Sequence, residues 1–230
     1  VENIIKSVYK YETFEFKTHK FKDLIGKEEP QIDFLIEDLL PCANLIILAG
    51  KPKLGKSLLA LQMSLCIALK KDLWDKKAKK GSVLFISTED SEIRLKKRIW
   101  KMLNNPSEYN PNFHFYIGSC ILTDKKVMQS LKLKVQELKP NLIVLDPLIN
   151  LFKNRELNSA EDMNQVLRPL QTLARESGAC VLVVHHARKS SGDDPIDIIQ
   201  GSITIAGVAD GLLILKSFKS LENEKKATLE

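Results

Sequence analysis

The stretch that decides the fold runs from residue 45 to residue 58 and reads Leu-Ile-Ile-Leu-Ala-Gly-Lys-Pro-Lys-Leu-Gly-Lys-Ser-Leu. Its apolar run at 45–49 predicts a buried strand, and the segment 57–69, which is apolar almost all round, predicts a helix packed beside a sheet. Between them, residues 50–57 match the phosphate-loop pattern G-x-x-x-x-G-K-[ST] in the strand-then-helix context that this pattern requires. The stretch therefore predicts an α/β protein that binds a nucleotide.

Each position of this loop has a physical role. Gly50 and Gly55 let the backbone turn so that successive N–H groups point inward, and the start of the next helix adds positive charge. Lys56 is expected to reach the β- and γ-phosphates of ATP, and Ser57 to ligate Mg²⁺. The alternative is a glycine-rich turn that binds nothing. The predicted nucleotide-binding residues are Gly50, Lys51, Pro52, Lys53, Leu54, Gly55, Lys56, Ser57 and Leu58.

Beyond the loop, short aliphatic runs alternate with helical patterns, which is typical of βαβ units and a mostly parallel sheet. Further strands are predicted at 83–87, 113–117, 142–146, 180–185 and 212–215, and the alternation at 113–117 also fits an edge strand. One helical face holds Val127, Leu131, Val135 and Leu138. Another runs from Met163 to Leu173, where Pro169 must kink or split the helix.

Composition limits the class of protein. The 230 residues are 44% hydrophobic and 28% charged, which suits one globular domain, predicted at 42–230 behind an arm or covering segment at 1–41. No apolar run approaches the roughly 20 residues of a membrane-spanning helix. The formal net charge of +6 permits a polyanionic partner without demanding one.

The cysteines indicate a compartment. Cys42, Cys66, Cys120 and Cys180 lie far apart, without Cys-x-x-Cys or zinc-ligand spacing. We interpret them as core thiols of a cytoplasmic protein.

Polar side chains follow several of these strands. Asp146 ends the strand at 142–146 and precedes Pro147, where it is expected to hold Mg²⁺, although an Asp here often only caps a turn. Glu89 and Asp90 follow the strand at 83–87, so Glu89 could orient the attacking water, or both could be first-turn carboxylates of the next helix. His185 and His186 end a further strand, where they could sense the γ-phosphate or be ordinary, partly buried histidines.

In their order along the chain, these motifs resemble the RecA-type ATPase core, over about residues 30–216. The resemblance is strongest to the branch of RepA-like hexameric replicative helicases and related bacterial and phage-borne ATPases. It rests on the phosphate loop, Ile86-Ser87-Thr88-Glu89-Asp90, Leu145-Asp146-Pro147-Leu148, His185-His186-Ala187-Arg188-Lys189, and Gly201-Ser202 before Ala209-Asp210-Gly211. It implies a RecA-like P-loop core, with a mostly parallel sheet flanked by helices.

The resemblance also implies roles. Glu89 would be the general base, and His186 would couple the γ-phosphate to the loop that follows it. The family forms rings, expected here to be hexamers, with ATP at the subunit interface and a basic side chain supplied by the neighbour. Arg188, Lys189 and Lys216 are the candidates, with Arg188 preferred. The family pattern continues past the strand at 212–215, so we expect a domain shortened at its C-terminus.

Single-stranded DNA is the polyanion that the resemblance implies, held by the loops at about 150–158 and 190–200. The first loop carries one net positive charge and the second is not basic. Apart from Phe152 beside Lys153, neither loop combines the aromatic and basic side chains that bind single-stranded DNA strongly. Two other clusters are basic, at 76–80 and 94–101. We interpret the first as a surface turn, with nucleic-acid contact as the alternative. We interpret the second as a helix whose Lys and Arg residues line the outside while Leu95, Ile99, Met102 and Leu103 face the core.

The sequence thus predicts a Mg²⁺-dependent ATPase, functioning as a helicase-like or DNA-associated motor in replication or recombination. The alternative is an ATP-binding oligomeric switch with little turnover and no DNA translocation. A small-molecule kinase would also use this loop, but the sequence shows no Arg-rich lid.

Overall fold

The structure of the chain is a computed structural model that describes residues 18–26, 31–103, 112–152, 160–186, 202–219 and 225–229. The chain divides into two compact units, Val1–Ile32 and Asp33–Glu230. The described residues of the first unit form a short helix, α2 (Phe21–Ile25), with exposed Phe21 and Ile25 side chains. The remaining described elements belong to the second unit. No helix in the described ranges is long and apolar enough to cross a membrane.

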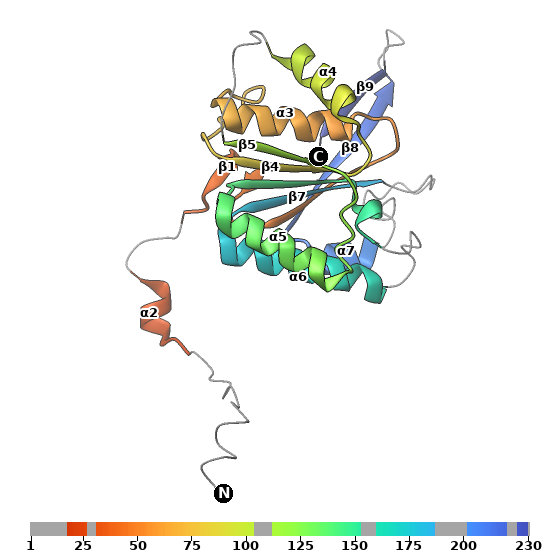
Figure 1. Cartoon of the computed structure of the whole chain (residues 1–230). Helices are drawn as coiled ribbons and strands as arrows, with labels where there is room; N and C mark the ends of the chain where they lie inside the picture. Colours follow the sequence, from red (N-terminus) through yellow and green to blue (C-terminus); the bar gives the residue numbers. More distant parts are fainter. Residues whose placement is uncertain are drawn as a thin grey trace, which may run out of the picture. The chain divides into compact units, whose positions relative to one another are not determined.

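A seven-stranded sheet forms the centre of the second unit, with the strand order β5-β4-β6-β7-β3-β8-β9 (Figure 1). The strands are β3 (Leu45–Gly50), β4 (Val83–Ser87), β5 (Phe113–Ile117), β6 (Leu142–Asp146), β7 (Cys180–His186), β8 (Gly211–Lys219) and β9 (Lys225–Leu229). Neighbours from β5 to β8 pair in parallel, and β9 pairs with β8 in antiparallel fashion. The predicted α/β fold with a mostly parallel sheet is confirmed, including the edge position of β5.

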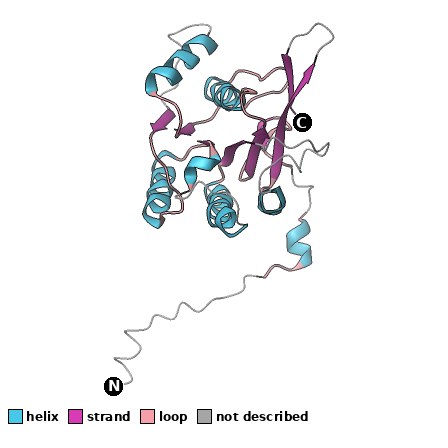
Figure 2. Ribbon diagram, turned by 90° about the vertical axis from the view of Figure 1, so that its right-hand side faces the viewer, coloured by secondary structure: helices cyan, strands magenta, loops and turns pink. Residues whose placement is uncertain are grey.

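Helices cover both faces of the sheet (Figures 1 and 2). On one face lie α3 (Lys56–Leu69) and α4 (Glu92–Met102), and on the other lie α5 (Lys125–Leu138), α6 (Ala160–Ser177) and α7 (Ser202–Val208). The sequence of β3 is continuously apolar because both faces of the strand are buried. Leu45 and Ile47 pack into one core, and Ile46 and Leu48 pack into the other. Pro169 lies inside α6, which runs unbroken, so the predicted split does not occur.

A small antiparallel pair of strands packs into the core on the α3 side of the sheet. It consists of β1 (Phe34–Ile36) and β2 (Leu40–Pro41), and its buried Leu35, Ile36 and Leu40 belong to the same core as α3. The basic cluster at 76–80 lies beside this pair, because Lys76 forms an ion pair with Asp38 and Lys79 with Asp33. Two lysines of that cluster are therefore engaged within the fold.

The parallel strands bring their carboxyl ends to one edge of the sheet, where ligands of open α/β sheets bind. The register places Ser87 opposite Asp146, and Gly50 opposite both His186 and Leu215. Glycine is required at position 50, since a Cβ there would lie 2.5 Å from the Leu215 carbonyl oxygen. The predicted functional residues on four different strands are thereby gathered at this edge.

Candidate nucleotide-binding site

The phosphate loop links β3 to α3 in an open anion cradle. Gly55 precedes α3 with φ 95°, in the left-handed region that favours glycine, and Lys53 has φ 65°. No side chain caps the start of α3, so its first N–H groups face the loop. Free amides and the positive end of a 14-residue helix suit phosphate oxygens.

Lys56 lies at the centre of this cradle and is only 3% exposed. Its Nζ donates hydrogen bonds to the carbonyl oxygens of Gly50 (2.8 Å) and Lys51 (2.9 Å). Burial lowers the pKa of Lys56 to about 8, against the attraction of Asp146 and Glu89, which raises it. The side chain is therefore still mostly protonated at pH 7, and it presents a cation inside the loop.

Ser57 and Asp146 form the second part of the site. The Ser57 hydroxyl donates a 3.0 Å hydrogen bond to Oδ1 of Asp146, which is 5% exposed. Burial raises the pKa of Asp146 to about 6; the Ser57 hydrogen bond and Arg98 lower it, and Asp90 and Glu89 raise it further. A hydroxyl beside a carboxylate is the oxygen donor set that Mg²⁺ takes together with water and phosphate oxygens. These two residues therefore fit the predicted metal.

No group of three or more His, Cys, Asp or Glu side chains in the described ranges could hold a metal by itself. A Mg²⁺ ion does not require such a group, because it keeps several waters and binds substrate phosphates. All four cysteines are free thiols: Cys66, Cys120 and Cys180 are buried, and Cys42 is half-buried.

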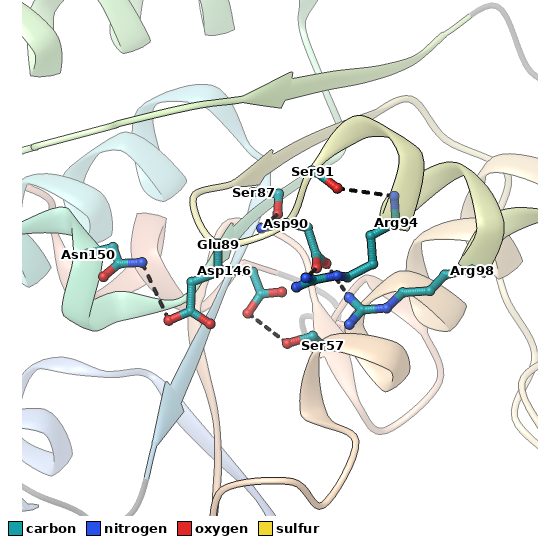
Figure 3. A network of polar contacts seen from close by, with 9 residues as sticks. All are labelled: Ser57, Ser87, Glu89, Asp90, Ser91, Arg94, Arg98, Asp146 and Asn150. Carbon is teal, nitrogen blue, oxygen red and sulfur yellow. Dashed lines mark hydrogen bonds and ion pairs between the residues drawn. The ribbon is translucent and has the colours of Figure 1, made fainter.

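A short link, Thr88–Ser91, joins β4 to α4 next to Asp146 (Figure 3). Ser91 caps α4 by accepting a hydrogen bond from the Arg94 N–H, so Glu89 and Asp90 both precede the helix. Asp90 forms ion pairs with Arg94 (3.4 Å) and Arg98, whereas Glu89 is exposed and accepts a 3.5 Å hydrogen bond from the Asn150 side chain. Only Asp90 is thus tied to α4 by its carboxylate, and Glu89 points elsewhere.

His186 ends β7 beside the loop, in register with Gly50. Burial lowers its pKa, Lys56 lowers it further, and Glu89 opposes this shift, so the imidazole is neutral at pH 7. Its Nδ1 is buried and has no hydrogen-bond partner within the described part of the chain. A neutral imidazole beside the cradle suits the predicted contact with a terminal phosphate.

Several predicted residues lie outside the described residues. They are Arg188, Lys189, Gly201, residues 153–158 of the first predicted DNA loop and the second predicted loop, 190–200. Lys216, the remaining candidate for action on a neighbouring subunit, lies on β8.

The position of Arg98 corrects the prediction for the basic cluster at 94–101. The Lys and Arg residues of α4 were predicted to line its outside, and Arg94 does, with a side chain 62% exposed. The Arg98 side chain is 30% exposed and turns inward because the buried Asp90 carboxylate attracts it. The spacing of four between Asp90, Arg94 and Arg98 lets both arginines reach back to Asp90, but it does not show which of them turns inward. Asn150 carried no comparable signal, because its partner Glu89 is distant in sequence.

Replacing Asp146 with Asn is expected to stabilise the free protein at pH 7.5. The folded-state pKa is raised from 3.8 to about 6, so the native state prefers the neutral carboxyl, and this stability is lost as pH rises through 6. This preference for the neutral carboxyl corresponds to about 3 kcal/mol, so we expect Asp146→Asn to raise the free energy of unfolding by about 1–3 kcal/mol at pH 7.5. Urea unfolding at pH 7.5 and near pH 3.5 measures the free energy of unfolding of the variant and the wild type. The gain should vanish near pH 3.5.

Asp75→Asn, at an exposed carboxylate, is the control and should change the free energy of unfolding by only a few tenths of a kcal/mol. Asp146→Asn should also lose the extra stabilisation by MgATP over ATP alone. An equal gain at both pH values would contradict the burial argument.

Comparisons with known proteins show what the chain is similar to. A family described as "AAA domain" matches residues 10–192. The chain is 24% identical over 149 residues to the DNA repair protein RadA of Streptococcus pyogenes serotype M6, covering 64% of this chain and 28% of that protein. It is 31% identical over 123 residues to the DNA repair protein RadA of Aquifex aeolicus, covering 54% and 23% respectively. The chain thus spans about a quarter of the length of these curated relatives.

A solved structure has the same fold. The crystal structure of a KaiC-like protein from Pyrococcus horikoshii superposes with a TM-score of 0.62 at 16% sequence identity, covering 85% of this chain and 81% of that one. The RecA-type fold predicted from the motifs is therefore confirmed, while the RepA-like branch stays a prediction.

Proposed function

Because the chain belongs to the AAA domain family, as a P-loop ATPase of the RecA type, we propose that it hydrolyses ATP with Mg²⁺ and works as a helicase-like or DNA-associated motor in replication or recombination. One observation carries the proposal of ATP hydrolysis. The ends of β3, β6 and β4 bring together a buried lysine, a hydroxyl–carboxylate pair and a separate exposed carboxylate. Phosphoryl transfer to water needs these groups: a cation for the phosphates, metal ligands and a base.

In the proposed mechanism each residue has one task. The loop amides and Lys56 bind the phosphates and neutralise the charge that develops on them. Ser57 and Asp146 would hold Mg²⁺, which would draw charge from the β- and γ-phosphate oxygens. Glu89 orients the attacking water and accepts its proton at a carboxylate oxygen. His186 donates a hydrogen bond from its neutral ring to the terminal phosphate.

The proposed partners follow from the family and the charge. We propose that the chain forms a ring, expected to be a hexamer. In this ring a basic residue of the neighbouring subunit completes the site, with Arg188 as the first candidate. Single-stranded DNA is the proposed polyanion, supported by the net charge of +6 and by relatives named as DNA repair proteins. The exposure of Glu89 supports a site that a second subunit completes, because an open site leaves the base in water.

ATP turnover per subunit is expected to rise with protein concentration and to rise at least severalfold further with single-stranded DNA. The physical reason is that a neighbouring subunit supplies the missing cation, which raises the rate of related phosphoryl transfers about 10³-fold or more. Phosphate release from 0.1 to 50 µM protein, with and without a poly(dT) oligonucleotide, measures both effects; double-stranded DNA is the comparison ligand.

The rival function is an ATP-binding switch, which the same exposure of Glu89 also permits. Tight ATP binding with negligible turnover at every concentration, unchanged by poly(dT), would favour the switch and overturn the motor. Turnover that rises with concentration but ignores DNA would keep the ATPase and remove the DNA-associated role.

A further inference from the structure

The side chain of Glu89 is not fixed by packing. It is exposed, and it borders a cavity of about 390 Å³ that lies between the ends of β4 and β5 and the 3₁₀ helix η1 (Leu148–Leu151). Its one side-chain hydrogen bond in the described residues, from Asn150, is long at 3.5 Å. A base must nevertheless be placed to within a fraction of an ångström, so its position depends on its backbone.

The backbone on the N-terminal side of Glu89 is anchored to the metal strand. Both the N–H and the hydroxyl of Thr88 donate hydrogen bonds to the Asp146 carbonyl oxygen, at 2.9 and 3.1 Å. The link therefore starts from a point fixed relative to the Ser57–Asp146 pair.

The backbone on the C-terminal side is anchored through a side chain. The Asp90 carboxylate is 7% exposed and forms ion pairs with Arg98 and Arg94 of α4 (Figure 3). The Asp90 N–H makes a 3.4 Å hydrogen bond to the Ser87 hydroxyl. Glu89 is thus held between two fixed neighbours, one attached to β6 and the other to α4.

The two arginines contribute unequally to this anchor. The Arg94 side chain is 62% exposed and its contact with Asp90 is 3.4 Å long, so water screens it. Arg98 makes the closer contact and its side chain is 30% exposed. A buried carboxylate that loses its main partner is left with an uncompensated charge, and the link must then shift to reach water.

We propose that Arg98 is a positioning residue for Glu89, acting through Asp90 to fix the Thr88–Ser91 link relative to the metal pair. The proposal rests on the proposed ATPase function, in which Glu89 is the base. It assigns to α4 the task of holding the base, in addition to packing against the sheet. Arg98 also balances the negative charge of Asp90 next to Asp146.

Arg98→Gln is expected to lower kcat about 10- to 100-fold and to change the Kd for MgATP less than threefold, because a misplaced base affects the chemical step and not the phosphate cradle. Arg98→Lys should recover part of the loss, since it restores the charge without the fork of the guanidinium. Lys97→Gln, an exposed position of the same helix, is the control and should match the wild type. Thermal unfolding of each variant shows whether it is folded.

A double-mutant cycle separates positioning from a general structural role. If Arg98 acts through Glu89, then Arg98→Gln should cause no further loss in single-turnover rate when Glu89 is already Gln. Amide hydrogen exchange in residues 87–91 should rise in Arg98→Gln and not in Lys97→Gln, whatever the activity. The pair Asp90→Asn with Arg98→Gln removes the uncompensated charge, so it keeps the test valid if the single variant does not fold.

The outcomes separate this proposal from the proposed function. Wild-type turnover with equal kcat in Arg98→Gln and Lys97→Gln would overturn the positioning role alone. So would equal losses from Arg98→Gln in the wild-type and Glu89→Gln backgrounds, or unchanged exchange in residues 87–91. No ATP turnover by the wild type under any condition would overturn both proposals.

Discussion

Lys56→Ala is expected to lower kcat/KM for ATP about 10³-fold, through losses in both ATP binding and the chemical step. The ammonium lies 3% exposed within the loop, where water screens it little, so its attraction to phosphate is stronger than that of a surface lysine. Removing one preorganised donor to a developing negative charge costs about 10²–10³ in rate, and Lys56 also contributes to binding. Phosphate release and equilibrium binding of a fluorescent ATP analogue measure the two parts.

Lys101→Ala removes an exposed lysine and is the matched control for the loss of a positive charge. Folding should survive in Lys56→Ala, because the buried ammonium is desolvated and its removal relieves that cost, although two loop carbonyls lose a donor. A folded Lys56→Ala variant that binds ATP as tightly as the wild type would contradict the assignment of the loop.

The fold could be predicted because its signals are local. Continuous apolar runs such as 142–145 mark strands buried on both faces, and the loop pattern at 50–57 predicts a strand before it and a helix after it. The strands β1, β2 and β9 were missed for the opposite reason. The three residues of β1, the two of β2 and the Lys-Lys-Ala-Thr-Leu sequence of β9 carry no periodicity, and their pairing depends on neighbours already in place.

The site shows the same division between local and distant information. Ser57 and Asp146 are 89 positions apart, yet each stands at a recognisable strand or helix end, and the parallel sheet brings them within 3.0 Å. The inward turn of Arg98 depends on the burial of Asp90, a property of the folded chain that a basic run does not reveal. The exposed Arg94 and the half-buried Arg98 look alike in sequence because both follow the same helical spacing.

Glu89→Gln is expected to lower turnover about 10²–10⁴-fold while leaving ATP bound. The amide keeps the shape of the side chain and its contact with Asn150 but cannot take a proton, and loss of a general base costs about 10²–10⁴ in rate. The Kd for MgATP should change less than threefold, because Lys56 and the loop amides are untouched. Single-turnover hydrolysis and equilibrium binding measure these effects, with Glu92→Gln, in the first turn of α4, as the matched control.

The split between binding and turnover is what distinguishes Glu89 from a carboxylate that only stabilises α4. A first-turn carboxylate contributes at most about 1 kcal/mol of helix stability, and its loss would lower the melting temperature without a selective effect on kcat. Glu92 is such a residue by position, so Glu92→Gln should show that weaker effect. Hydrolysis that survives in Glu89→Gln at the wild-type rate would remove Glu89 as the base. It would also remove the reason for Arg98 to hold the link, since the two predictions depend on the same carboxylate.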